Sequence, residues 1–252
     1  MLYARIHKLA TSNLGRSLVL MKIRGTSLAV KFLLTLFVAK FLGFEDLGLY
    51  GLISAGTIIA PVILGLCLMT SISRKAVTLP LADIINHLKN YSKYTLLVYT
   101  ILLPVSYIIG LLTDREVMAL LIFAVIVLEH FNNDIYGLLL NLSKPLSANL
   151  LHCIRTAAWP MLYMPIAYFI PEYRELNILL LFWLIGAIAS LAIFVLIAKN
   201  WPWRPLLKSS SMIPWIITEF KDSKILYINS LTDTAGTYLN HLLITILLSL
   251  EL

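Results

Sequence analysis

Ionisable side chains inside long apolar stretches are the residues of this sequence best placed to bind an ion or a charged ligand. A charge in apolar surroundings costs on the order of 3 kcal/mol, so it persists where it meets a partner or a water-filled cavity. The basic and acidic residues in such stretches are Lys22, Arg24, Lys31, Lys40, Glu129, Asp134, Arg155 and Asp233.

The first apolar stretch carries a cationic stripe. Arg24 and Lys31 are seven residues apart, so they project from one face of a helix, and Thr35 extends that face. Lys22 and Lys40 lie nearer the two ends, where long side chains can extend to a polar boundary. The stripe is therefore expected to face protein or water.

A later stretch is polar on two sides. One helical face combines Glu129 with Asn132, Asn133 and Tyr136, and another carries Asp134 beside His130. Arg155, on the next stretch, lies at a similar depth and could pair with either acid. Two interpretations stay open, an ion pair that locks helices together and a group that lines a transport path.

The last apolar stretch repeats this pattern more weakly, because Asp233 and Asn240 share a face with Thr237. That face is expected to line a cavity or a helix contact.

The sequence lacks the residue spacings typical of enzymes and metal sites. The cysteines Cys67 and Cys153 are isolated, the histidines are scattered, and no glycine-rich phosphate loop occurs. We therefore predict no enzyme, no catalytic residue, no cofactor and no metal site.

Composition explains where these charges sit. Of the 252 residues, 60% are hydrophobic and 13% are charged, against about 25% charged in a soluble domain. Lipid must be the solvent, and the net charge of +7 comes from short basic groups between apolar runs rather than from a nucleic-acid surface. We predict an all-α, polytopic transmembrane helix bundle of about seven spans, since a span needs about 20 apolar residues. The predicted spans are 18–43, 47–69, 94–113, 117–140, 146–170, 176–198 and 225–250.

The distribution of lysine and arginine predicts the orientation. With the N-terminus in the cytoplasm, the inner segments hold most of the basic residues, whereas the outer links hold only Arg115 and Arg174. The links 70–93 and 199–224 are expected to include helices along the membrane surface.

The run from Lys31 to Tyr50 resembles the start of polysaccharide flippases of the multidrug/oligosaccharidyl-lipid/polysaccharide exporter superfamily. In that family a helix ends in a basic residue and Leu-Gly. An acidic pair and a Leu-Gly-x-Tyr turn follow, as Glu45-Asp46 and Leu47-Gly48-Leu49-Tyr50 do here.

The resemblance implies translocation of an undecaprenyl-diphosphate-linked oligosaccharide across the bacterial cytoplasmic membrane, for O-antigen, capsule or exopolysaccharide. It implies a cationic cavity in which Arg24, Lys31 and Arg155 attract the substrate. Glu129, Asp134 and Asp233 would couple ions or hold the cations. Thr35, Asn132, Asn133, Tyr136 and Asn240 would line the cavity. Partners would be the lipid-linked oligosaccharide, the bilayer, and the polysaccharide polymerase with its chain-length machinery.

The family usually has two six-helix lobes. Residues 1–224 are expected to form one lobe and residues 225–252 the first helix of a second, incomplete lobe, as in a truncated chain. Alternatives are an exporter of another substrate, such as a drug or the peptidoglycan lipid precursor, and a non-transporting membrane subunit or inactive remnant. A membrane-embedded enzyme acting on lipid-linked sugars is a further alternative.

Overall fold

The protein is built from helices. The computed structural model describes residues 13–203 and 211–250, with side chains from residue 17 to 203 and from 211 to 236, and no β-strand occurs in these ranges. Four helices are long and apolar enough to cross a membrane: α3 (Phe44–Gly65), α5 (Leu81–Leu112), α6 (Glu116–Asn141) and α9 (Leu176–Ala198). They indicate a membrane protein.

The other three predicted spans differ from this pattern. The first is helix α2 (Asn13–Phe41), which is long but carries Lys22, Arg24, Lys31 and Lys40. The fifth is broken into α7 (Pro145–Cys153), a π-helical turn η1 (Ile154–Ala158) and α8 (Trp159–Phe169). The seventh lies inside a longer helix, α10 (Met212–Leu250). The sequence-based estimate of seven spans is thus matched by four helices among those described, and the remaining three stay predictions.

The short link after α2 depends on one glycine. The backbone N–H groups of Leu42 and Gly43 both donate to the Val38 carbonyl, at 2.9 and 3.1 Å. Gly43 has φ 104°, which residues with a Cβ rarely adopt. This cap ends α2 at Phe41 and allows α3 to begin at Phe44.

Contacts divide the chain into two compact units. Unit 1 comprises Met1–Thr57 and Thr100–Trp201, and unit 2 comprises Ile58–Tyr99 and Pro202–Leu252. Two boundaries between the units fall inside helices. The boundary between Thr57 and Ile58 lies in α3, and the boundary between Tyr99 and Thr100 lies in α5.

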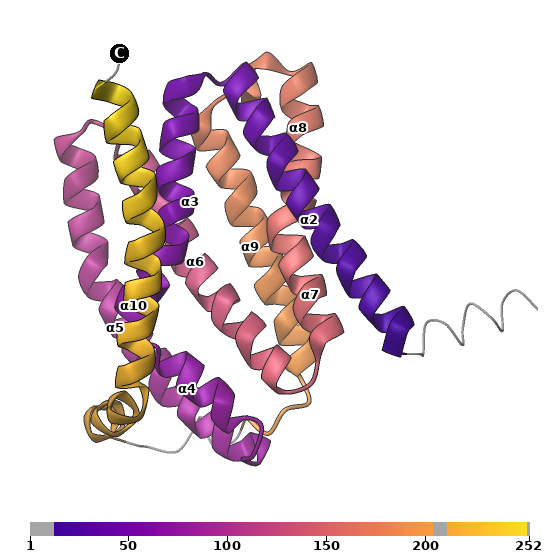
Figure 1. The fold of residues 1–252 in the computed structure, drawn as a ribbon, viewed down its shortest axis with the longest axis vertical. Coiled ribbons are helices and arrows are strands. Elements are labelled where there is room, and N and C mark those ends of the chain that lie inside the picture. Colours follow the sequence, from indigo (N-terminus) through magenta and orange to yellow (C-terminus); the bar gives the residue numbers. More distant parts are fainter. Residues whose placement is uncertain (1–12, 204–210, 251–252) are drawn as a thin grey trace, which may run out of the picture. The chain divides into compact units, whose positions relative to one another are not determined.

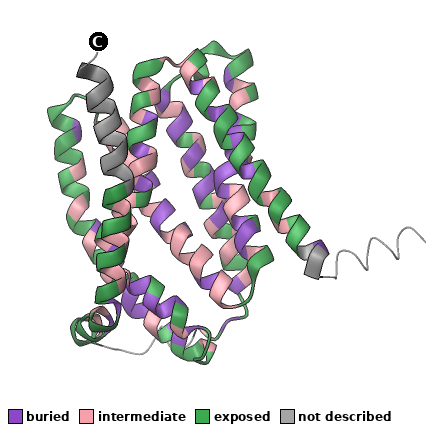
Figure 2. Ribbon diagram, viewed as in Figure 1, coloured by how far each residue is buried: buried purple, intermediate pink, exposed green. Residues whose placement is uncertain are grey.

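In unit 1, α6 packs along α9, and the broken helix α7–η1–α8 packs between α9 and α2 (Figure 1). The core between these helices contains the buried residues Trp159, Tyr163, Leu179, Leu180 and Trp183 of α8 and α9. Buried residues gather on η1, α8 and α9, whereas α2 is largely exposed (Figure 2). Only a narrow ridge of α2, which includes Ser27, Val30, Leu34 and Val38, is buried. The two flanks of that ridge are therefore available for other contacts.

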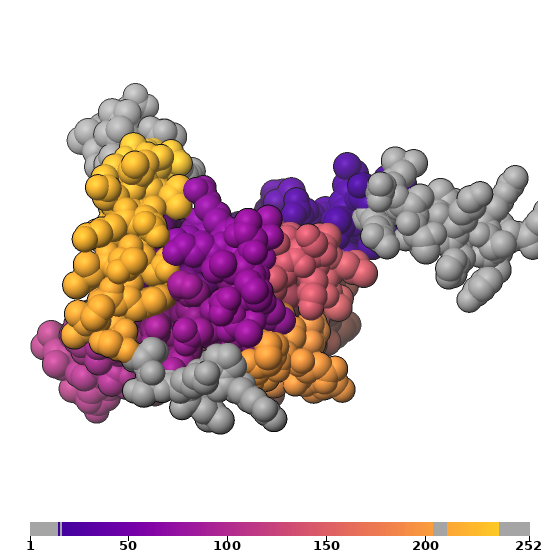
Figure 3. Space-filling view, turned by 90° about the horizontal axis from the view of Figure 1, so that it is seen from below, coloured from indigo at the N-terminus to yellow at the C-terminus, as the bar shows by residue number. Residues whose placement is uncertain are grey.

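In unit 2, the short helix α4 (Leu68–Lys75) packs against α10. The surfaces of α4 (purple) and α10 (yellow) adjoin in Figure 3. Leu68, Ile72, Ile84 and Ile85 are fully buried here, so α4 and the start of α5 form a small apolar centre. The link 70–93, predicted to contain helix, does so in α4 and in the first turns of α5.

Candidate functional site

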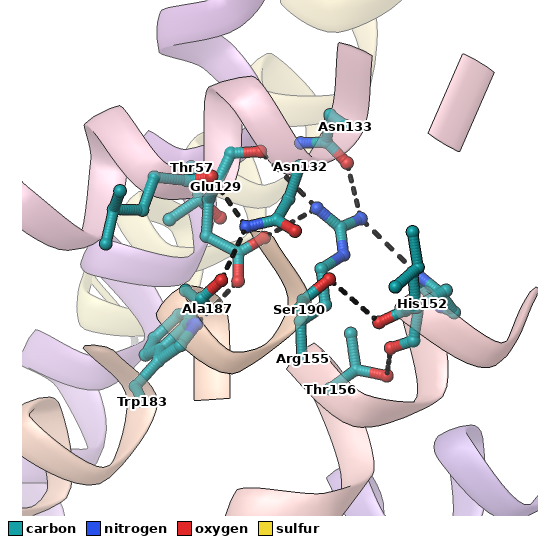
Figure 4. A network of polar contacts seen from close by, with 12 residues as sticks. Thr57, Glu129, Asn132, Asn133, His152, Arg155, Thr156, Trp183, Ala187 and Ser190 are labelled. Atoms are coloured by element: carbon teal, nitrogen blue, oxygen red, sulfur yellow. Dashed lines mark hydrogen bonds and ion pairs between the residues drawn. The ribbon is translucent and has the colours of Figure 1, made fainter. Parts of the chain in front are cut away.

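A buried ion pair lies at the centre of unit 1. Arg155 Nη1 is 2.9 Å from Glu129 Oε2, and the two side chains are 6% and 7% exposed. Arg155 Nη2 also donates to Asn133 Oδ1 at 2.6 Å and lies 3.3 Å from His152 Nδ1. Of the two acids considered as partners for Arg155, the structure places Glu129 against it (Figure 4).

The second oxygen of Glu129 joins the pair to α9. Trp183 Nε1 donates to Glu129 Oε1 at 2.8 Å, and Asn132 Nδ2 donates to the Ala187 carbonyl at 3.1 Å. Both oxygens of the carboxylate are thus hydrogen-bonded away from water, as a buried charge requires. These contacts hold α6, η1 and α9 together.

The π-helical turn positions Arg155. It ends directly before Trp159 and Pro160. Pro160 has no N–H to donate to the preceding turn, and the Trp159 indole instead donates to the Arg155 carbonyl at 2.9 Å. The Thr156 hydroxyl donates to the His152 carbonyl at 2.6 Å. Such wide turns are rare inside α-helices and occur often at functional sites.

Arg155 is not fully satisfied by its partners. Its Nε is buried and has no acceptor among the described residues. Buried donors without a partner are uncommon in native proteins. Among the described residues, the Nε–H is therefore the one N–H group of Arg155 that has no hydrogen-bond acceptor.

Arg24 extends the polar network to the surface. Its Nε donates to Asn149 Oδ1 at 2.8 Å, and its Nη2 donates to the Tyr136 hydroxyl at 2.9 Å. The Tyr136 ring lies 5.4 Å from the His152 ring, centroid to centroid. Through Tyr136 and His152, Arg24 thus connects to Arg155, while its own side chain remains exposed.

Lys31 differs from Arg24. It is exposed on the same helix, and within the described part of the chain its ammonium group has neither a hydrogen bond nor an ion pair. Thr35 is also exposed and donates to the Lys31 carbonyl at 3.0 Å. The expected face of α2 therefore exists, with one tethered cation and one unpaired cation.

The remaining predicted site residues, Asp134, Asp233 and Asn240, come from α6 and α10. Asp134 Oδ2 is 3.4 Å from His130 Nε2, one helical turn away on α6. Asp233 is exposed on α10, in unit 2. The side chain of Asn240 lies outside the described residues, so its predicted position on the same face stays a prediction.

A second buried carboxylate, in unit 2, was not anticipated from the sequence. Glu219 of α10 is 2.7 Å from Lys75 Nζ, 3.1 Å from His87 Nδ1 and 3.1 Å from Ser71 Oγ. Trp215 Nε1 lies 3.0 Å from the same His87 Nδ1, and a ring nitrogen that donates to Glu219 cannot also accept from the indole. We call Glu219, Lys75, His87, Ser71 and Trp215 the Glu219 cluster; it joins α4, α5 and α10.

Electrostatics in the Glu219 cluster favour the charged forms. Burial alone would raise the pKa of Glu219, but hydrogen bonds and positive charge from His87 and Lys75 outweigh burial and lower it to about 2. Burial would likewise lower the pKa of Lys75, whereas the Glu219 and Asp222 carboxylates raise it above its ordinary value. The cluster is thus a stable ion pair at neutral pH.

Several residues of the unit 1 network were also missed. Asn149, Trp183 and His152 hold the charged groups, although only His152 was noticed, as a scattered histidine. The usable signal was chemical. An indole N–H or an amide in an apolar helix needs a partner, and Trp183 and Asn149 both lie within apolar helical stretches.

Comparison with known proteins found no match: no protein-family model, no curated protein and no solved structure is similar to this chain.

Proposed function

We propose that the chain takes part in moving undecaprenyl-diphosphate-linked oligosaccharide units across the bacterial cytoplasmic membrane for surface polysaccharide. The single observation that carries the proposal is the unpaired Lys31 on the exposed flank of α2, beside the tethered Arg24. The likeness of the 31–50 run to polysaccharide flippases supports the same function.

The physical reason is the cost of an unpaired cation in a helix that borders lipid. A charge deep in a bilayer is retained where it faces water or a ligand, and a cation in a low-dielectric cleft concentrates potential on an anion. A diphosphate offers several oxygens to Lys and Arg donors. Lys31 would contact it directly and Arg24 would contact it from a fixed position.

Arg155 has a narrower role in this proposal. Its guanidinium is committed to Glu129 and Asn133 and is buried, so it would set the potential and position α6 rather than bind substrate. Glu129 would hold Arg155 in place. Asp134 and Asp233 would remain the candidates for ion coupling.

The wider arrangement belongs to the same proposal. The chain would have seven spans with a cytoplasmic N-terminus, residues 1–224 forming one lobe and residues 225–252 beginning another. It would bind through electrostatics without catalysis, and work beside a polymerase and its chain-length partners.

A second candidate is a non-transporting membrane subunit. The observation that favours it is the Arg155–Glu129 pair, which is enclosed and bonded on both sides, as expected of a lock between helices. In that case the cations of α2 would serve packing alone.

Binding of a prenyl diphosphate separates the two candidates. The full chain, purified in detergent, would be titrated with farnesyl diphosphate as the probe. Lys31→Gln should weaken binding by about tenfold or more, as loss of a charge-assisted contact does. Lys22→Gln, on the same helix nearer its start, is the matched control and should bind normally. Equal binding by the Lys31→Gln variant and the unmodified chain would reject the transport site.

Folding is monitored in the same samples by thermal unfolding. Arg24→Gln removes two hydrogen bonds, so its unfolding temperature is expected to fall modestly. If Arg24→Gln lowered stability and neither variant changed binding, the structural-subunit interpretation would replace the proposal.

A further inference from the structure

We propose that unit 1 carries a site for one anionic phospholipid, at the end of α2 and α8, independent of the transport activity proposed above. An apolar groove runs between the two helices on the flank of α2 opposite the cationic stripe. Its lining includes Val30, Leu33, Phe37, Met161, Met164 and Tyr168.

The position of the groove on α2 follows from helical geometry. Taking 100° per residue, Leu33 and Phe37 lie on one side of the buried ridge, and Arg24 and Lys31 lie on the other. Leu33, Met161 and Tyr168 are about half exposed, at 52%, 55% and 55%. In a membrane this surface meets acyl chains rather than water.

The groove and the aromatic ring at its end together have the length of one leaflet. The α2 residues that line the groove run from Val30 to Phe37, a rise of about 10 Å at 1.5 Å per residue. Phe41 and its two cations lie about 16 Å from Val30, about half of the 30 Å hydrocarbon thickness. An acyl chain of one phospholipid therefore matches it, whereas a polyprenyl chain of many isoprene units would extend well beyond it.

Two cations lie at the end of the groove. Lys40 Nζ is 5.3 Å and Arg174 Cζ is 5.0 Å from the centre of the Phe41 ring. Phe41 in turn contacts the Tyr168 ring edge-on at 5.9 Å. Cations beside aromatic rings at the end of a span are typical of the headgroup region of a bilayer.

Arg174 is held by two hydrogen bonds, and its other N–H groups remain available. Its Nε donates to the Ala167 carbonyl and its Nη2 to the Tyr168 carbonyl, both at 2.9 Å, so it caps α8. Of the five N–H groups of an arginine, the others have no acceptor among the described residues. They are available to a phosphate, which arginine binds with two parallel hydrogen bonds.

The charge distribution of the sequence makes the pairing specific. Basic residues are scarce in the links predicted to be outside, namely Arg115 and Arg174, and Arg115 lies 3.9 Å from Glu45. Lys40 and Arg174 both lie over the Phe41 ring, which contacts Tyr168 of the groove. Arg174 also lines a pocket that contains Glu45, Asp46 and Glu175. The two cations thus match an anionic headgroup, and the adjoining apolar groove matches an acyl chain.

The test is lipid retention by the full chain. Protein would be reconstituted in phosphatidylcholine nanodiscs with or without phosphatidylglycerol, and the lipid that stays bound after extraction would be identified by native mass spectrometry. The unmodified chain should retain phosphatidylglycerol in preference to phosphatidylcholine. Lys40→Gln should reduce that retention about fivefold, the usual effect of one cation near a membrane surface.

Three further variants keep the test decisive. Leu33→Trp fills the groove without changing charge and should also lose the retained lipid. Arg115→Gln is the matched control, a cation of an outer link away from the groove, and should retain it. Arg174→Lys keeps one charge but loses the two-pronged donor, so partial retention is expected.

Equal retention of the two lipids, or retention unchanged in both Lys40→Gln and Leu33→Trp, would overturn the site. Retention of an added polyprenyl phosphate in place of phospholipid would overturn the choice of ligand. Neither result depends on the binding of farnesyl diphosphate, so failure here and failure of the transport proposal are distinguishable.

Discussion

The two units each bury a carboxylate against a cation, and they do so with different chemistry. In unit 1, Glu129 faces Arg155, whose guanidinium stays charged at any pH a protein tolerates. In unit 2, Glu219 faces the ammonium group of Lys75 and the imidazole of His87. The first pair is enclosed by protein, whereas the second is open to solvent on the side of Lys75.

Exposure increases the contrast. Arg155 and Glu129 are 6% and 7% exposed, so neither can be hydrated when its partner is removed. Lys75 is 31% exposed beside a Glu219 that is 2% exposed, and its ammonium can turn to solvent. Losing a partner should therefore cost more in unit 1 than in unit 2.

The largest effect is expected for Glu129→Gln. The substitution leaves the Arg155 charge buried without a counter-charge, which costs about 3–5 kcal/mol. Unfolding of the purified protein in detergent, followed by circular dichroism, measures the loss. The double variant Glu129→Gln with Arg155→Gln should recover part of it, because two neutral amides replace an unpaired charge. A double variant less stable than Glu129→Gln alone would contradict the ion-pair account.

A smaller effect is expected for Glu219→Gln, about 2 kcal/mol, since Lys75 can be hydrated. Hydrogen exchange of the segments 68–75 and 212–224 measures it locally. Both segments should exchange faster in the variant, while exchange in α9 stays unchanged. Faster exchange throughout the chain would contradict a local role for the Glu219 cluster.

The same cluster predicts a pH dependence with a defined sign. The pKa of Glu219 is lowered from 4.5 to about 2 in the folded chain, so its stabilising contribution is complete above about pH 4.5 and is lost as the pH falls through about 2. The groups facing it are Lys75, His87 and, through Lys75, Asp222. Exchange in 212–224 should rise over that range in the unmodified chain and stay level in Glu219→Gln. A parallel rise in both would assign the effect to other carboxylates.

The sequence predicts one of these two regions and misses the other, for a physical reason. Glu129 and Arg155 stand out because they interrupt apolar stretches, and matching their depths pointed to a pair. Glu219 lies in a polar link among lysines and serines, where a carboxylate is ordinary. Its burial arises from α4 packing on α10, a contact between residues more than 140 positions apart.

The sequence also predicts some of the helices well and others poorly. The all-α class follows from hydropathy, and α3, α5, α6 and α9 agree with predicted spans to within a few residues at most ends. The exception is α5, which begins at Leu81 rather than near residue 94. The break between α7 and α8 could not be read from apolar periodicity, because it depends on how Trp159 and Pro160 replace backbone hydrogen bonds around Arg155.

Tight packing around Trp183 allows a test of unit 1 that leaves its charges intact. A Cβ at Gly186 would lie 2.5 Å from Trp159 Cδ1 and 3.0 Å from Trp159 Cβ, and Trp159 stacks on Trp183 at 5.7 Å. Gly186→Ala should therefore destabilise the protein by about 1–3 kcal/mol through overpacking. Thermal unfolding measures it, with Gly236→Ala as the control because no atom lies within 4 Å of that Cβ. Equal stability of the two variants would contradict close packing of α9 on η1 and α8.

The smallest effect is expected where the unit 1 network reaches the surface. Tyr136→Phe removes the hydroxyl that accepts from Arg24 Nη2 but keeps the ring beside His152. Arg24 stays exposed and retains Asn149, so the loss should be about 0.5–1.5 kcal/mol, the net value of one hydrogen bond. Because the variant leaves the Arg155–Glu129 pair intact, combining it with Glu129→Gln tests whether the two ends of the network act separately. Additive losses of stability would mean that Arg24 can reorient without disturbing the buried pair, as a cation that binds and releases a ligand must. A combined loss well below the sum would instead make Arg24 part of the same rigid lock as Glu129, and would favour the structural-subunit interpretation.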